Sequence, residues 1–122
     1  MLAIYSMNRK QQVGKQGEQV AVNWLLQNGY TVLYTNWRHK RLEVDAVASI
    51  GKKLVIVEVK SSTTQQFGHA EQKVTDKKLV QLKKASEELQ ILHPEFTALE
   101  ILVIAVEYQQ ETPTITVFYD VY

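Results

Sequence analysis

Residues 42–60 read LEVDAVASIGKKLVIVEVK, a stretch that predicts a β-hairpin with charged residues at its open end. Strands are expected near 42–50 and 53–60, joined around Gly51, because glycine accepts the positive φ of a tight hairpin turn. The run LVIV at 54–57 has no polar alternation, which is typical of a strand covered on both faces. Charges beside such a strand need partners, since an unpaired ion in a dry interior costs many kcal/mol.

The rest of the chain adds two helices and three strands to this hairpin. Capping signals mark the boundaries, with Asn28-Gly29 after one apolar helical stripe and Thr75 before another. The order α-β-β-β-α-β-β predicts an α/β fold with one sheet covered by helices. The expected elements are a loose or partly helical lead-in at 1–13, a helix at about 14–28, a strand at 30–37, a polar turn at 38–41, a polar loop at 61–74, a helix from Thr75 to before Pro94, and strands at about 99–107 and 114–119.

Length and composition place the chain among ordinary globular domains. Its 122 residues suffice for a single domain, 1–122, and folding a chain of this size buries roughly two-thirds of its surface. The absence of cysteine excludes a disulfide framework and Cys-ligated zinc, and His39, His69 and His93 are too dispersed for a local metal motif. No signal peptide and no apolar stretch of roughly 18 residues is found, so we expect a soluble, cytoplasmic protein without a membrane partner.

Charge is divided unevenly along the chain. Residues 1–84 hold fourteen basic and six acidic side chains, whereas residues 85–122 hold seven acidic ones and no basic one. Such asymmetry is expected if one surface of the protein meets a polyanion. The alternative is that the local excesses cancel in the fold.

A charged site is expected at the end of the 53–60 strand. Side chains alternate along a strand, so Glu58 and Lys60 share one face. Hairpin pairing can bring Glu43 or Asp45 beside Glu58, with Cβ atoms roughly 5 Å apart. Two carboxylates so placed repel each other unless a hard divalent cation such as Mg²⁺ lies between them. An ammonium beside such an ion can orient or activate a water, or stabilise charge on a phosphate.

Each of these residues also has an ordinary structural explanation. Glu58 and Lys60 alone would form an ion pair at a strand end. Glu18 borders the apolar stripe of the first helix and can lean toward the site, although alone it would be a solvated helix residue. Their coincidence beside a buried strand, in the basic part of the chain, favours a metal site. The second helix carries four lysines that alone would form an exposed face, Lys77, Lys78, Lys83 and Lys84.

Short motifs follow one another in a distinctive order between about Gly14 and Ala85. They are Gly14-Lys15-Gln16-Gly17-Glu18, Ala21, Leu25 to Gly29-Tyr30, Asn36-Trp37-Arg38, Glu43-Val44-Asp45, the strand 54–60, Phe67-Gly68, and Val74-Thr75 followed by Lys78. In this order they resemble the YraN-like family of uncharacterised bacterial proteins. That family is similar to the restriction endonuclease-like PD-(D/E)xK nuclease superfamily and, within it, to Holliday-junction resolvases of archaeal type.

The resemblance implies a fold and a site. The fold is a restriction endonuclease-like αβββαβ core with a mixed central sheet flanked by helices. Asp45 and Glu58 would be ligands of Mg²⁺ or Mn²⁺, together with the backbone carbonyl of Val59. Lys60 would be the catalytic lysine, and Glu18 the helix-borne catalytic acid.

The resemblance also implies contacts to nucleic acid. Arg38 and Lys78 fall at recurrent basic positions and would contact phosphates. Two positions depart from the family pattern. Leu42 stands where Gly or Ala is usual before Glu43, which narrows the approach to the site. Ser62 stands where Arg is common, which removes one bidentate phosphate partner.

The leading hypothesis is therefore a metal-dependent nuclease that hydrolyses phosphodiester bonds in DNA, with branched or junction DNA among the candidate substrates. One alternative is a nucleic-acid-binding module without catalysis, whose binding would fall steeply with salt. Another is a structural or adaptor protein whose acidic C-terminal third docks a partner, without metal or nucleic acid. Because junction-cleaving enzymes often pair two sites across a dimer, a homodimer is an open alternative to a monomer.

Overall fold

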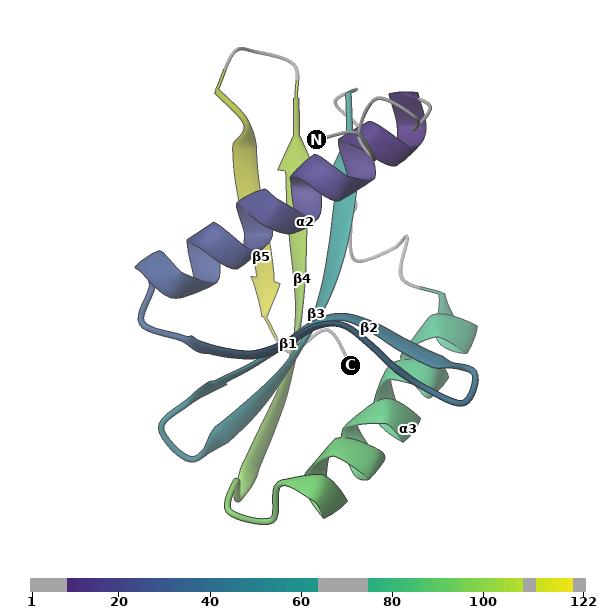
Figure 1. Ribbon diagram of the computed structural model, residues 1–122, viewed down its shortest axis with the longest axis vertical. Coiled ribbons are helices and arrows are strands. Elements are labelled where there is room, and N and C mark those ends of the chain that lie inside the picture. Colours follow the sequence, from purple (N-terminus) through teal and green to yellow (C-terminus); the bar gives the residue numbers. More distant parts are fainter. Residues whose placement is uncertain (1–8, 64–74, 109–111, 120–122) are drawn as a thin grey trace.

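The computed structural model describes residues 9–63, 75–108 and 112–119 (Figure 1). The predicted α/β class is confirmed, because a five-stranded sheet carries one helix on each face. The strand order is β1-β2-β3-β4-β5, and the sheet is mixed, since β3 and β4 are parallel while the other neighbours are antiparallel. The elements are α2 (Arg9–Gln27), β1 (Thr31–His39), β2 (Leu42–Ile50), β3 (Lys53–Ser62), α3 (Asp76–Leu92), β4 (Ala98–Glu107) and β5 (Thr114–Tyr119).

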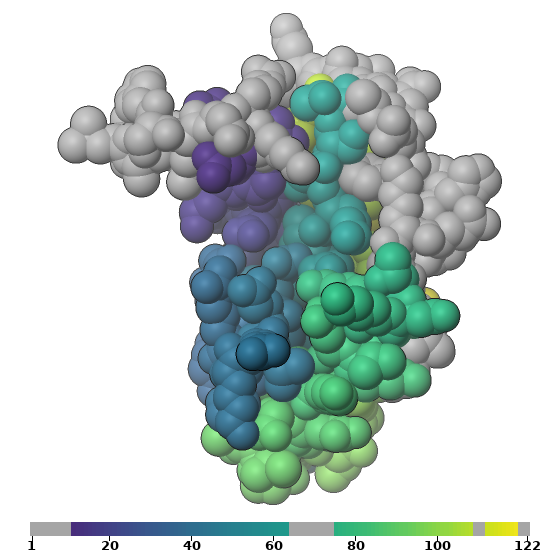
Figure 2. Space-filling view, turned by 90° about the vertical axis from the view of Figure 1, so that its right-hand side faces the viewer, coloured from purple at the N-terminus to yellow at the C-terminus, as the bar shows by residue number. Residues whose placement is uncertain are grey.

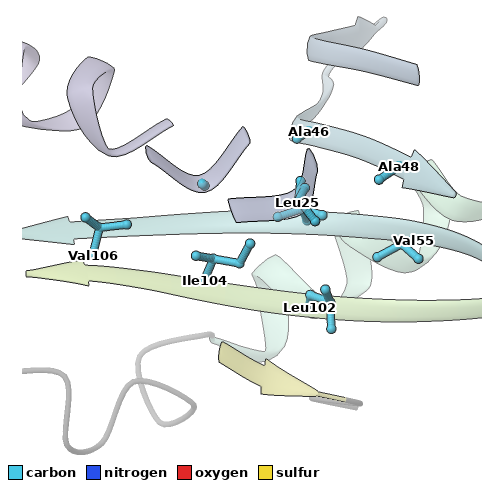
Figure 3. Close-up of a cluster of buried hydrophobic side chains, with 9 residues drawn as sticks. Leu25, Ala46, Ala48, Val55, Leu102, Ile104 and Val106 are labelled. Atoms are coloured by element: carbon cyan, nitrogen blue, oxygen red, sulfur yellow. The ribbon is translucent and has the colours of Figure 1, made fainter. Parts of the chain in front are cut away.

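The buried strand β3 lies at the centre of two hydrophobic layers. Its residues 54–57 are 0% exposed, as the apolar run predicted. Val55 and Val57 pack with Leu25 of α2, and Figure 3 shows Leu25 over the sheet near Val55. On the other face Leu54 and Ile56 pack against the buried side of α3. Each such side chain stabilises the fold by about 1.5–3 kcal/mol, so the strand is held firmly in place.

The position of α3 follows from the parallel pairing of β3 and β4. Parallel neighbours need a crossover between opposite ends of the sheet, and α3 lies within that crossover. The helix begins at the predicted N-cap, where the Thr75 hydroxyl accepts a hydrogen bond from the Lys78 N–H at 3.1 Å. This cap places Lys78 in the first turn, beside the end of β3. Among the described helices, none is long and apolar enough to cross a membrane.

Helix α2 approaches β3 closely at Gly17. A Cβ on Gly17 would overlap the Ser61 hydroxyl and lie 2.9 Å from the Ser61 Cβ, so glycine alone fits without displacement. At Gly14, one turn earlier, a Cβ would meet nothing within 4 Å. The contact therefore fixes the spacing between helix and sheet next to Glu18.

Three predicted boundaries were wrong. α2 begins at Arg9 rather than at about residue 14, so the part of the lead-in that is described, residues 9–13, is helical, which is one of the two alternatives expected for it; residues 1–8 lie outside the description. Apolar periodicity missed this start because the first turns are polar. β1 and β3 continue to His39 and Ser62, because the neighbouring strands pair with them there. Sequence cannot show such pairing. Residues 64–74 of the expected 61–74 loop lie outside the described residues.

Candidate functional site

A fork between β2 and β3 brings two of the predicted carboxylates together. The two strands pair from their turn as far as Ala46 and Val57, and then separate. Asp45 and Glu58 occupy the next position on each strand. Beyond it β3 continues beside β4 to Ser62, whereas β2 continues beside β1 (Figure 1). The two carboxylates thus lie at the base of the fork.

The Asp45 carboxylate enters this fork. Its Oδ2 accepts a hydrogen bond from the backbone N–H of Val59 at 2.7 Å. Hydrogen bonds from a backbone donor to a carboxylate are short and strong, and this one satisfies a donor beside the point where the strands separate. Asp45 is therefore held between the two strands rather than on the open face of one of them.

Glu58 lies on the α3 face of β3 and is almost fully buried. Its side chain is 6% exposed, and two ammonium groups approach its Oε2. The Lys78 Nζ lies 3.2 Å away and the Lys60 Nζ 3.9 Å away. Lys60 comes from the same strand, two residues on, as the Glu-x-Lys spacing predicted. Lys78 comes from α3, a contact that depends on how the helix packs on the sheet.

The electrostatics of Glu58 reflect its burial and its neighbour. Burial, followed by the hydrogen bond and the repulsion from Asp45, raises the pKa of Glu58 from 4.5 to about 7, against the lowering effect of Lys78 and Lys60. Near neutral pH the side chain is therefore about half protonated. A cation between the two carboxylates would favour the ionised form, because it would remove their repulsion.

Glu18 approaches Asp45 from α2. Burial and the repulsion from Asp45 raise the pKa of Glu18, while Lys15 and a hydrogen bond from Asn36 lower it. α2 covers the opposite face of the sheet from α3, so Glu18 stands across the fork from Glu58. Within the part of the chain that is described, no three His, Asp or Glu side chains converge closely enough to hold a metal ion. Glu18 therefore lies next to the Asp45–Glu58 pair but does not form a three-carboxylate cluster with it.

Two hollows open beside Glu18. A cavity of about 120 Å³ is lined by Lys15, Glu18, Gln19, Val22, Thr35, Asn36 and Asp45. A groove of about 510 Å³ is lined by Val13, Gly14, Glu18, Val59, Ser61, Ser62 and Thr63. The fork is therefore accessible from the α2 side of the sheet.

The elements that carry these residues adjoin on one face of the molecule. Figure 2 shows α2 in purple, the β1–β2 hairpin in blue, the end of β3 in teal and α3 in green around a common centre. Segments far apart in the sequence are thus brought to one surface. The basic first part of the chain supplies three of these elements and the start of the fourth.

Two other predicted residues lie at the surface of the hairpin. Glu43, the second carboxylate that hairpin pairing could bring to Glu58, is paired with Arg38 across β1 and β2. The Arg38 guanidinium lies 3.4 Å from the Glu43 carboxylate, and both side chains are more than half exposed. Arg38 is free to reach solvent, whereas Lys78, the other predicted phosphate contact, is directed at Glu58.

Sequence reasoning missed Lys15 and Asn36 as members of the site. Asn36 adopts a left-handed backbone, with φ of 51°, inside β1. One signal was available, since asparagine is depleted in strands and tolerates that conformation better than other non-glycine residues. Lys15 gave no comparable signal, because a lysine on an amphipathic helix is usually solvated.

This geometry defines an α/β protein with a paired-carboxylate site at a strand fork. The family model described as "Uncharacterised protein family UPF0102" matches residues 17–117, and the chain belongs to this family. The motif-based prediction is thereby confirmed at the level of the family.

Curated UPF0102 proteins from several bacteria are similar to this chain. The relative from Leifsonia xyli subsp. xyli is 37% identical over 82 residues, which cover 67% of this chain and 70% of the relative. The relative from Caldicellulosiruptor bescii is 42% identical over 81 residues, covering 66% and 67%. The relative from Phocaeicola vulgatus is 37% identical over 73 residues, covering 60% of each. The matched segment is thus somewhat shorter than these relatives.

Proposed function

We propose that this chain is a metal-dependent nuclease of the restriction endonuclease-like PD-(D/E)xK superfamily, which hydrolyses phosphodiester bonds in DNA. The observation that carries the proposal is the Asp45–Glu58 pair at the fork, with Lys60 near the Glu58 carboxylate. The element order supports it, because the two acids lie on the second and third strands of an αβββαβ arrangement. The site, and not the fold alone, is the basis of the proposal.

The oxygen donors at the fork fit Mg²⁺ or Mn²⁺. Such ions prefer carboxylate, carbonyl and water oxygens, and they commonly keep several waters when a protein holds them by one or two carboxylates. Asp45 and Glu58 would supply the carboxylates, and Val59 its backbone carbonyl. The raised pKa of Glu58 supports this assignment, since a cation would relieve the repulsion that contributes to it.

The chain's own side chains would divide the work of hydrolysis. When bound, the ion would supply Lewis acidity and lower the pKa of a water. The Lys60 ammonium would stabilise the negative charge that develops on the phosphate. Lys78 would exchange its contact with Glu58 for a phosphate oxygen, and Arg38 would bind a phosphate further along the strand. Glu18, a carboxyl with a raised pKa beside the groove, would accept a proton from the attacking water.

A cleavage panel tests this proposal. Labelled branched, duplex and single-stranded DNA are incubated with Mg²⁺ or Mn²⁺ and with the wild-type, Asp45→Asn, Glu58→Gln or Glu43→Gln protein. We expect cleavage by the wild type and by Glu43→Gln, because Glu43 is an exposed carboxylate of the same hairpin outside the fork. The two fork variants should fall to background and bind Mn²⁺ more weakly in calorimetry. Metal-dependent cleavage that survives both fork changes contradicts the mechanism.

Lys60→Ala separates catalysis from metal binding. The lysine is no proposed ligand, so its removal should leave Mn²⁺ affinity within a few-fold of the wild type while cleavage is lost. Equal losses of affinity and cleavage would instead indicate that Lys60 maintains the geometry of Glu58.

One observation favours a second function, a nucleic-acid-binding module without catalysis. The Lys78 and Lys60 ammonium groups lie 3.2 and 3.9 Å from the Glu58 carboxylate, so two cations already face this carboxylate without a metal ion. In that case Glu58→Gln should strengthen DNA binding, because it frees the Lys60 and Lys78 ammonium groups for phosphates, and Asp45→Asn should strengthen it because it removes a negative charge. Fluorescence anisotropy at several salt concentrations would show tight, salt-sensitive binding and no cleavage with any divalent ion.

A further inference from the structure

In the β1–β2 hairpin, the alternation of side chains between the two faces of the sheet is interrupted at the level of Asn36 and Asp45. Side chains three residues apart along a strand normally lie on opposite faces of a sheet. Here Tyr34 and Trp37 both pack on the α3 side of the core, and so do their paired residues on β2. The strands shift register between Val32 and Tyr34. From Tyr34 to His39 the register is constant, and Asn36 and Asp45 occupy the level within it that is not paired. The alternation of both strands is therefore shifted at this level.

The backbone of Asn36 departs from extended geometry at this level. Its φ of 51° lies in the left-handed region, which asparagine tolerates better than other residues with a Cβ. Among the described non-glycine residues only Lys40 also has a positive φ, and Lys40 lies in the β1–β2 turn. A left-handed residue inside a strand does not reverse the chain. It interrupts the alternation, so the side chains that follow it lie on the opposite face of the sheet from the one expected. Across the hairpin, Asp45 leaves the alternating pattern and its carboxylate reaches the Val59 N–H.

The side chain of Asn36 makes a second connection. It hydrogen-bonds to the Glu18 carboxylate, and an ionised carboxylate only accepts, so the amide is the donor. Glu18 and Asp45 repel each other, and the Lys15 ammonium and the Asn36 amide both counter this repulsion at Glu18. Asn36, Glu18 and Asp45 line the same small cavity, so Asn36 lies beside both acids.

We infer that Asn36 is a positioning residue for the fork: its left-handed backbone directs Asp45 between β2 and β3, and its amide holds Glu18 beside Asp45. The purpose of this arrangement rests on the proposed nuclease function, but the arrangement itself is testable without metal or DNA. Two substitutions separate the two roles. Glycine keeps the left-handed backbone and removes the amide, whereas alanine removes the amide and disfavours the backbone.

The first experiment observes the amide directly in the metal-free protein. The side-chain NH₂ signals of Asn36 are recorded in a ¹H–¹⁵N spectrum of the full chain and assigned by their absence in Asn36→Gly. We expect them to be displaced from the free-amide position in the wild type and in Glu43→Gln, and to return to it in Glu18→Ala, which removes the acceptor. Free-amide signals in the wild type, or signals that Glu18→Ala leaves unchanged, would overturn the inference whatever the protein does to DNA.

The second experiment measures the consequence for the site. Cleavage rate and Mn²⁺ affinity are compared for Asn36→Gly, Glu18→Gln and the double variant, with Lys40→Gly as a matched control that relieves the same backbone conformation in the turn. We expect each single change to lower the cleavage rate about 10- to 100-fold, as supporting residues of metal sites commonly do, and the double variant to be no worse. Asn36→Ala should be slower still, and Lys40→Gly unchanged. Independent, multiplying losses would contradict positioning of Glu18 by Asn36.

The two experiments fail in distinguishable ways. If the wild type binds no metal and cuts no DNA, the proposed function is wrong and the spectrum alone decides the inference. If the wild type cuts and Asn36→Gly cuts equally well, the amide has no positioning role although the proposed function stands. Circular dichroism melting checks that Asn36→Gly is folded, which the acceptance of a positive φ by glycine predicts.

Discussion

The β2–β3 hairpin has a closed half and an open half that are built on opposite principles. From Ala46 and Val57 to the turn at Gly51, the strands pair, and their apolar side chains are buried except for Ile50 next to the turn. At Asp45 and Glu58 the strands separate and place like charges side by side. The closed half stabilises the fold, whereas the open half lowers its stability. A local cost of this kind is expected where a protein keeps a binding or catalytic site.

The largest expected effect lies in the closed half. Ile56→Ala removes a fully buried side chain between β3 and α3, and should lower the free energy of unfolding by about 2–5 kcal/mol. Val59→Ala, beyond the fork and only partly buried, should cost about 1 kcal/mol or less. Urea unfolding of both variants measures the difference. Equal losses would show that the two halves do not differ as described.

Sequence predicted the closed half well because its signals are local. The unbroken apolar run at 54–57 indicated burial on both faces, and Gly51 indicated the turn between the strands. The same reasoning applies to Thr75, whose N-cap role needs only its immediate neighbours. Where a few adjacent residues decide the structure, the sequence is sufficient.

The open half depended on contacts between distant segments. Hairpin pairing left Glu43 and Asp45 as equal candidates, and only the register of β2 with β3 brings Asp45 to Glu58. The Lys78 contact required the packing of α3 on the sheet, and the left-handed Asn36 required the exact bend of the hairpin. Such features arise from tertiary structure, and the only local signal for them was the presence of an asparagine inside a strand.

A second prediction concerns pH, because the open half contains an acid with a raised pKa. The folded chain holds the Glu58 proton up to about pH 7, whereas the unfolded chain releases it near 4.5. Between these values the folded state binds more protons, so the free energy of unfolding should fall as pH rises through this window. The total decrease in the free energy of unfolding is about 3 kcal/mol. It should be complete above pH 7 and absent below pH 4.5.

Denaturation of the metal-free protein at pH 5 and pH 8 measures this effect. Glu58→Gln should remove most of the pH dependence and be the more stable protein at pH 8. Glu43→Gln, an exposed change on the same hairpin, should retain the wild-type pH dependence. A stability that rises from pH 5 to pH 8 in the wild type, and not in Glu58→Gln, would reverse the assignment.

Next in size is the contact that holds α2 against the open half. Gly17→Ala places a Cβ against Ser61, an overpacking cost of about 1–3 kcal/mol that exceeds the gain of up to about 1 kcal/mol from replacing a helical glycine. Gly14→Ala meets open space and should stabilise the protein by about 0.5–1 kcal/mol. Opposite signs in the two melting temperatures are expected. Stabilisation by both changes would mean that the packing of α2 on the sheet does not require the close contact between Gly17 and Ser61.

The smallest effect on stability should come from the exposed ion pair of the hairpin. Arg38 and Glu43 are 74% and 61% exposed, so Arg38→Ala should change the free energy of unfolding by about 0.5 kcal/mol or less. If Arg38 contacts a phosphate, the same change should weaken DNA binding and reduce the salt dependence by about one counterion, while Glu43→Ala, which frees the guanidinium, should strengthen binding. Anisotropy titrations of both variants measure this. Because neither change affects stability much, opposite changes in DNA affinity would show a direct contact between Arg38 and the DNA. Equal affinities of the two variants would show that Arg38 does not contact nucleic acid.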